Sequence, residues 1–157
     1  MPSEALFIGI ATIAVVIAGF TAVTSGLTPP TGTWDAGQRI RQRAIVSTSF
    51  NVMFESLVPP TVFALLQDVH SSLVLSSAAV AVYTLVIVVV RARQLLRAGG
   101  PRTLAARVMF VLGPTACLLF AANALVFASA GVYALALCVQ LSVAALSFYS
   151  LVASASS

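Results

Sequence analysis

Residues 72–90 read SLVLSSAAVAVYTLVIVVV, and this stretch contains no charged side chain. A helix needs about 20 mostly apolar residues to cross the hydrocarbon core of a bilayer. The stretch meets that length, and its few hydroxyl groups can bond within a helix. Residues 72–90 therefore predict a transmembrane helix.

Apolar runs of similar length recur on both sides of this segment. Each run is about twice as long as a barrel strand, and none alternates strictly between polar and apolar residues, so helices are expected. Spans four and five are separated only by a few small residues around Ser129 and should form a tight antiparallel hairpin. The sequence predicts one all-α integral membrane domain over residues 1–157, with five transmembrane helices at about 5–27, 44–66, 72–90, 108–128 and 131–153.

The bulk composition excludes the other classes of protein. Hydrophobic residues make up 60% of the 157 residues, and charged residues make up 8%. A soluble domain is about half apolar and about a quarter charged, and a chain of this size cannot bury so much apolar surface in water. Disordered chains need low hydrophobicity. A membrane protein is the remaining class.

The basic residues are all arginines, and they fall into two connections between predicted spans. With five spans these two connections lie on the same side, which the positive-inside rule makes cytoplasmic. The N-terminus is then expected outside and the C-terminus inside. The first connection holds Arg39, Arg41 and Arg43, and the second holds Arg91, Arg93, Arg97, Arg102 and Arg107.

Arginines beside apolar spans are typical of contact with lipid headgroups or with a partner protein. Nucleic-acid binding is not expected from this placement. Trp34 lies where an interfacial anchor belongs. Arginine without lysine, together with frequent alanine and valine, indicates a GC-rich bacterial genome and hence the bacterial cytoplasmic (inner) membrane. The residues expected at headgroups or at a partner are Trp34, Arg39, Arg41, Arg43, Arg91, Arg93 and Arg97.

Catalytic and cofactor chemistry finds little support in the residue inventory. The absence of lysine excludes a retinal or pyridoxal Schiff base. His70 is the only histidine, which excludes a two-histidine metal or haem site within one chain. Cys117 and Cys138 have no metal-binding spacing and are interpreted as small buried hydrophobes. We expect no cofactor, no metal and no enzymatic activity.

Glu55 is the exception to this pattern, because it lies at the middle of the second span. A charge at that depth costs about 3 kcal/mol on insertion scales, so intramembrane acids usually face a bundle interior. Ser47, Asn51, Glu55 and Pro59 are spaced four apart and form one polar stripe. Pro59 has no N–H for the carbonyl of Glu55, so the sequence predicts a kink at Pro59–Pro60 and a freed carbonyl beside a carboxyl group. Transporters often build cation or proton sites in this way.

Polar residues at the same depth in other spans are the candidates for contact with Glu55. Tyr83 and Gln140 lie near the middle of their spans, and Asn123 lies somewhat nearer the outside. Because no arginine reaches the midplane, Glu55 is expected to be protonated at rest. The same carboxyl group, bonded to Asn51, Gln140 or Tyr83, could instead hold helices together. Tyr133 and Tyr149 fit interfacial positions.

Two functions follow from these features. The first is a structural or accessory subunit that packs laterally against other membrane subunits or copies of itself, because the chain is small and nearly free of loops. The alternative is a homo-oligomeric channel, or a proton- or cation-coupled carrier, centred on Glu55. The polar site expected for that alternative comprises Asn51, Glu55, Pro59, Tyr83, Asn123 and Gln140.

Overall fold

The computed structural model describes the backbone of residues 1, 3–26, 36–97 and 104–155, and within these residues every regular element is a helix. Five helices are long and apolar enough to cross a membrane. The prediction of an all-helical chain with five such segments is therefore confirmed. The elements are α1 (Glu4–Gly26), α2 (Ala36–Leu66), α3 (Val69–Arg97), α4 (Leu104–Ala122), a π-helical turn η1 (Asn123–Phe127) and α5 (Ala130–Ala155).

Helices α2 and α3 extend furthest beyond the predicted spans. Helix α2 begins at Ala36 and α3 continues to Arg97, so both include arginines beyond the apolar stretch. Helical hydrogen bonding does not stop at the edge of a bilayer, and long arginine side chains can place their charge in water while the helix continues. Helix α2 also runs through Pro59 and Pro60 to Leu66.

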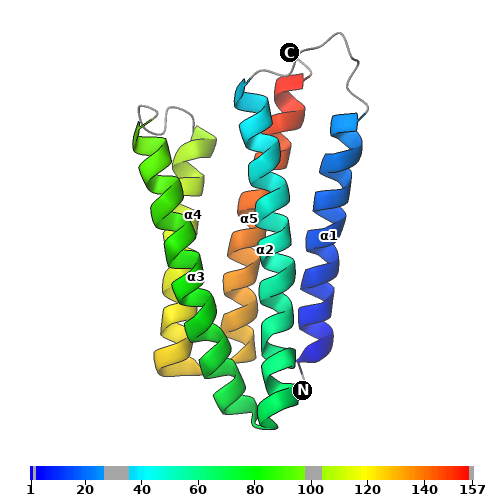
Figure 1. Ribbon diagram of the computed structural model, residues 1–157. Helices are drawn as coiled ribbons and strands as arrows, with labels where there is room; N and C mark the ends of the chain where they lie inside the picture. The colour runs from blue at the N-terminus through cyan, green and yellow to red at the C-terminus, as the bar shows by residue number, and fades with distance from the viewer. Residues whose placement is uncertain (2, 27–35, 98–103, 156–157) are drawn as a thin grey trace.

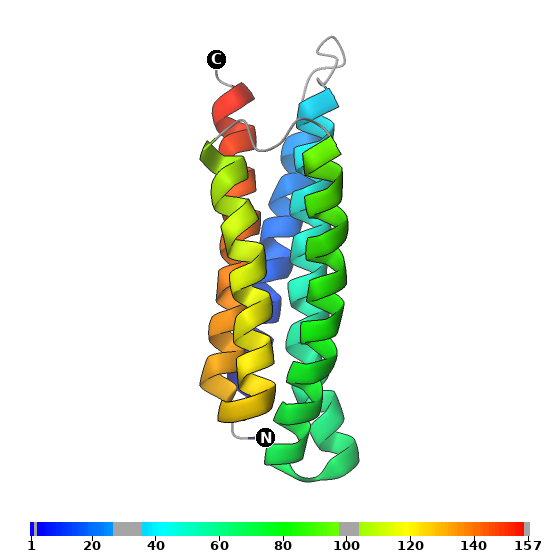
Figure 2. The same ribbon diagram turned by 90° about the vertical axis from the view of Figure 1, so that its left-hand side faces the viewer.

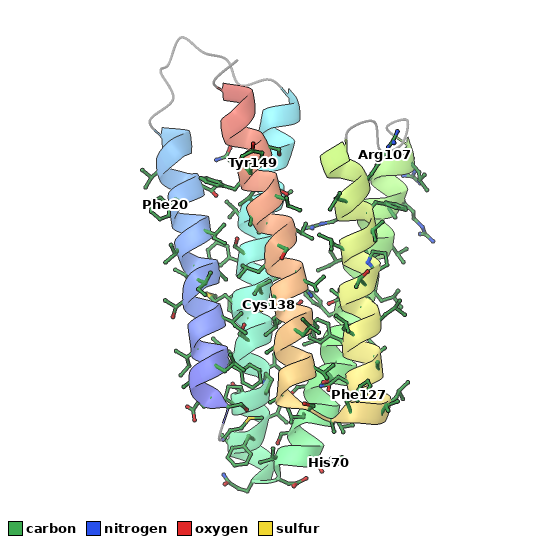
Figure 3. The ribbon with its side chains drawn as sticks, turned by 180° about the vertical axis from the view of Figure 1, so that it is seen from behind. Phe20, His70, Arg107, Phe127, Cys138 and Tyr149 are labelled. Carbon is green, nitrogen blue, oxygen red and sulfur yellow. The ribbon has the colours of Figure 1, made fainter. Side chains whose placement is uncertain are left out.

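The helices alternate in direction along the bundle (Figures 1 and 2). The C-terminal ends of α1, α3 and α5 and the N-terminal ends of α2 and α4 lie together, and we call this the arginine end. The N-terminus of the chain, the α2–α3 turn and η1 lie at the opposite end, which we call the turn end. Arg107 and His70 mark the two ends (Figure 3).

Helices α2 and α4 lie diagonally opposite each other in the bundle and do not pack as neighbours. Helix α2 packs against α1, α3 and α5, and α4 packs against α3 and α5. Within the described ranges no Cα atom of α2 lies within 8 Å of a Cα atom of α4. The space between these two helices is therefore the place where an internal cavity can form.

Three aromatic side chains fill the core on the turn side of the bundle centre. Tyr133 packs edge-on against Phe7, with ring centroids 5.5 Å apart, and against Phe120, at 5.0 Å. All three side chains are fully buried, and we call them the aromatic layer. The expectation that Tyr133 lies at the membrane interface is wrong, because its hydroxyl group finds a hydrogen-bond partner inside the bundle.

The α2–α3 turn depends on two polar residues. Gln67 takes a left-handed conformation, with φ of 56°, and its N–H donates to the carbonyl of Phe63 at 2.8 Å. Asp68 then caps α3, since its carboxylate accepts the N–H of Ser71 at 2.8 Å. Hydrogen bonds from the Ser71 side chain and main chain hold the pKa of Asp68 below its usual range.

The outer surface is apolar, as a bilayer requires. Phe20 and Phe127 point away from the bundle axis (Figure 3), and they are 62% and 58% exposed. Tyr149 is also exposed, near the arginine end. Apolar side chains cover both the side of each helix that faces the bundle interior and the side that faces outward. Few positions on each helix are therefore polar.

Candidate functional site

A cavity of about 300 Å³ lies between α2, α3, α4 and α5, and we call it the central cavity. Aliphatic and aromatic side chains, including Ile87, Val88, Phe110 and Val143, form much of its wall. On each of these four helices the lining residues extend from the level of Glu55 towards the arginine end. The polar residues that line it are Thr48, Asn51, Glu55, Thr84, Arg91, Gln140 and Ser147.

The carboxyl group of Glu55 lies at the inner limit of the central cavity. The residue is only 4% exposed, and its Oε2 atom has no hydrogen-bond partner among the described residues. The side chains of Gln140 and Thr84 lie within hydrogen-bonding reach of the carboxyl group. These two also bond to each other, with Gln140 Nε2 donating to Thr84 Oγ1 at 3.2 Å. One carboxyl oxygen, Oε2, is thus not satisfied by any described residue.

The main-chain carbonyl of Glu55 has a different environment. Tyr133 donates its hydroxyl proton to this carbonyl at 2.7 Å. Pro59, which is fully buried, lies one turn further towards the turn end and supplies no N–H to it. The sequence suggested that this freed carbonyl would help to bind a cation. The bond from Tyr133 instead links α5 to α2 at that point.

Arg91 lies at the other end of the central cavity. Its guanidinium group donates from Nη1 to Thr48 Oγ1 at 3.1 Å and from Nη2 to Ser47 Oγ at 3.3 Å. The side chain is half-buried, so this arginine turns inward between α2 and α3. Thr48 precedes Glu55 by about two helical turns, or ~10 Å along α2. The cavity therefore has a cation near one end and a carboxyl group at the other.

Asn51 and Tyr83 form a separate contact beside the cavity. Tyr83 donates its hydroxyl proton to Asn51 Oδ1 at 3.0 Å. A second cavity, of about 350 Å³, is lined by α2 and α3 alone and also touches Asn51 and Glu55. Tyr83 is 46% exposed, so this second cavity lies towards the outer surface of the bundle.

Asn123 does not join this group, although the sequence placed it in the same polar site. It lies in η1 at the turn end, where its Nδ2 donates to Ser77 Oγ at 2.8 Å. Its Oδ1 accepts the N–H of Ser129 at 2.9 Å, and its carbonyl accepts the N–H of Ala128 at 2.8 Å. Asn123 therefore stabilises the connection between α4 and α5, where Ala128 is left-handed with φ of 45°.

The other arginines singled out from the sequence lie away from the central cavity. Arg43, Arg93 and Arg97 are exposed at the arginine end. Trp34 and the side chains of Arg39 and Arg41 lie outside the described residues. Of the arginines expected to meet headgroups or a partner, Arg91 is the one that lines the cavity.

Besides Arg91, the contributors to the site that the sequence did not indicate include Thr48, Thr84 and Tyr133. A threonine in an apolar helix usually bonds to its own main chain, as Thr61 does to the carbonyl of Leu57 at 2.7 Å. Nothing in the sequence distinguishes Thr48 or Thr84 from such residues. Tyr133 lies close to the end of a span, where a tyrosine normally faces the membrane interface.

A metal site is not evident in the part of the chain that the structure describes, because no three His, Cys, Asp or Glu side chains gather there. The central cavity is instead a small, mainly apolar pocket with a few converging polar groups, which is typical of small-molecule sites. No known protein family, curated protein or solved structure matches the chain.

Proposed function

We propose that this protein is a small membrane carrier in which Glu55 binds the coupling proton or a cationic group. The observation that carries the proposal is the buried Oε2 atom of Glu55, which has no hydrogen-bond partner among the described residues and belongs to a residue that lines the central cavity. Intramembrane acids are costly and usually mark ion or substrate pathways. A pocket of this size lies at the lower end of the range for small-molecule sites, about 300–1,000 Å³.

A purely structural role of Glu55 is the competing interpretation. Gln140 and Thr84 lie within reach of the carboxyl group, but other hydrogen bonds also link the helices near this level: Tyr133 to the carbonyl of Glu55, Tyr83 to Asn51, and Gln140 to Thr84. A carboxyl group kept only to hold helices together would be expected to use both of its oxygens. The free oxygen of Glu55 favours a ligand-binding role.

The shape of the central cavity supports access from one side. Its lining extends from Glu55 to Arg91, whereas the aromatic layer fills the core on the turn side. Since the arginine end is cytoplasmic by the positive-inside rule, we propose that the cavity opens to the cytoplasm of a bacterial inner membrane, with the N-terminus outside. We further propose that α2 bends at Pro59–Pro60 when access changes sides, because the missing N–H groups weaken that turn.

The cavity also bears on the number of chains that a carrier would need. From the sequence, five helices seemed too few to enclose a path, so a homo-oligomer was expected. Four of the chain's five membrane-spanning helices, α2, α3, α4 and α5, line the central cavity. We therefore propose that the substrate site is complete in a single copy.

An accessory subunit remains the second candidate, and helix α1 favours it. This helix contributes no residue to the central cavity and exposes a face that includes Ile13, Phe20 and Val23, at 52%, 62% and 58%. Another membrane subunit could pack on that face. Stoichiometric purification with other subunits, undisturbed by Glu55→Gln, would support this candidate.

Proton uptake into proteoliposomes tests the carrier proposal. The purified chain is reconstituted with an internal pH dye, and a potassium diffusion potential drives protons inward. We expect uptake above that of empty liposomes, and loss of this uptake in Glu55→Gln. Glu4→Gln is the matched control, because Glu4 is an exposed acid beside the N-terminal amine, 3.7 Å away. Equal uptake by wild type and Glu55→Gln would contradict the proposal.

A further inference from the structure

The two ends of the central cavity differ in charge, and this difference suggests what the cavity binds. We infer that its ligand is a small soluble zwitterion, with an ammonium group at Glu55 and a carboxylate or phosphate near Arg91. This inference rests on the proposed function, since it names the substrate class for the same site.

The Glu55 end calls for a hydrogen-bond donor. Oε2 is buried and has no hydrogen-bond partner among the described residues, while Gln140 and Thr84 lie within hydrogen-bonding reach of the carboxyl group. A buried acceptor left unpaired is costly, so a ligand that donates to it gains affinity. An ammonium group supplies both the donor and the opposite charge.

The Arg91 end calls for an anionic group. Two guanidinium nitrogens bond to the hydroxyl groups of Thr48 and Ser47, which are neutral acceptors. A guanidinium group carries five N–H donors, so further donors remain for a ligand. An anion there would complete the charge balance of a half-buried cation.

Simpler ligands fit less well. An organic cation without an anionic group would have to pass Arg91 and remain in the same cavity with it. An amphiphilic anion would leave Oε2 of Glu55 without a donor. A divalent metal ion needs about six oxygen ligands, whereas much of the wall consists of residues such as Ile87, Val88 and Val143.

The spacing of the two groups defines the length of the ligand. Arg91 is held at the level of Thr48, ~10 Å along α2 from Glu55. Both charged groups also need room for a hydrogen bond to the protein. A short aliphatic chain between the ammonium and the anionic group fits that gap and packs against the apolar wall.

Linear ω-amino acids are suitable probes for this inference. The purified full chain is titrated calorimetrically with 4-aminobutyrate, 6-aminohexanoate and 8-aminooctanoate, and with hexylamine and hexanoate, each against a detergent blank. We expect at least one ω-amino acid to bind ten or more times tighter than either single-charge compound, because each charged end adds a charge-assisted bond.

Substitutions assign the two ends separately. Arg91→Gln should lower the affinity for the ω-amino acid about tenfold or more, towards that for hexylamine, and Glu55→Gln should lower it towards that for hexanoate. Arg93→Gln is the matched control, since Arg93 is exposed and does not line the cavity. Size-exclusion profiles show whether each variant is folded, and an affinity change counts only in variants that elute like wild type.

Several results would overturn the inference. These are binding of hexylamine as tight as that of the ω-amino acids, equal effects of Arg91→Gln and Arg93→Gln, or no binding of any ω-amino acid. Binding of phosphatidylethanolamine in nanodiscs, with none of the soluble probes, would assign the zwitterion to a lipid headgroup and overturn the soluble substrate. If proton uptake still depends on Glu55 while no zwitterion binds, the proposed carrier function is retained and the inferred substrate class is rejected.

Discussion

The hydroxyl group of Tyr133 donates a 2.7 Å hydrogen bond to the main-chain carbonyl of Glu55. This carbonyl is the one that Pro59 leaves without its helical partner. The bond from α5 satisfies the main chain of Glu55, and the side chain remains available to the central cavity. We propose that structural and ligand-binding roles are thereby divided between two parts of one residue.

Removing that hydroxyl group tests the structural part of this division. Tyr133→Phe keeps the ring contacts with Phe7 and Phe120 but leaves a buried carbonyl unpaired. We expect a loss of about 1 kcal/mol in the free energy of unfolding, measured by denaturation in mixed micelles. Tyr149→Phe is the control, because Tyr149 is 73% exposed.

A second substitution shows whether the proline is the reason for the bond. Pro59→Ala restores a main-chain N–H that can donate to the carbonyl of Glu55 within α2. In that background Tyr133→Phe should cost less than it does in the wild type, as a double-mutant cycle would measure. Equal costs in both backgrounds would mean that the missing N–H does not explain the role of Tyr133.

The cap on α3 should make part of the stability depend on pH. Hydrogen bonds from Ser71 lower the pKa of Asp68 in the folded chain relative to the unfolded chain. The stabilisation is therefore complete above the unfolded pKa, about 3.9, and is lost as pH falls through the lower folded value. Asp68→Asn keeps a good capping residue but removes this titration.

Thermal unfolding of the two proteins between pH 6 and pH 2.5 checks the Asp68 prediction. The wild type should lose more of its unfolding temperature than Asp68→Asn over this interval. Other acids, such as Glu4, are common to both proteins and cancel in the comparison. Parallel curves would show that the cap does not contribute to acid sensitivity.

The one-sided cavity predicts a pattern of cysteine labelling. After Cys117→Ala and Cys138→Ala, a cysteine is introduced by Val143→Cys in the cavity wall or by Leu137→Cys in the buried core. A charged, membrane-impermeant thiosulfonate should label the first variant from the arginine side only. It should label the second poorly from either side, since Leu137 is fully buried.

This labelling experiment also tests orientation. Right-side-out cells and inverted vesicles expose opposite faces of the membrane. Labelling of Val143→Cys in inverted vesicles alone would agree with a cytoplasmic arginine end. Labelling from the periplasmic face would contradict the orientation that we propose.

The sequence was sufficient for the number of helices and for part of the site. Apolar length alone identifies five spans, because a bilayer imposes that length on any helix that crosses it. Depth matching correctly brought Gln140 towards Glu55, and it placed Tyr83 close enough to bond to Asn51. Depth follows from position along a helix, so a sequence can provide it.

Rotation of each helix about its own axis could not be predicted in the same way. In a membrane both the lipid-facing and the core-facing sides are apolar, so hydrophobicity does not indicate which side faces inward. For this reason Tyr133 was expected at the interface and Arg91 among the headgroups. Asn123 was grouped with Glu55 although its position along the chain already placed it nearer the outside, and it lies at the turn end. Only the packing of the five helices determines these orientations.

Infrared spectroscopy of the Glu55 carboxyl group tests the central claim most directly. If Glu55 binds the coupling proton, as we propose, its carboxyl group must exchange that proton with water through the central cavity. The difference between the spectra of wild type and Glu55→Gln isolates its signal in proteoliposomes. A protonated-carboxyl band at neutral pH that shifts in D₂O and changes when 6-aminohexanoate is added is the result that we predict. A carboxylate already ionised at neutral pH, or a protonated band unaffected by D₂O, would contradict the account.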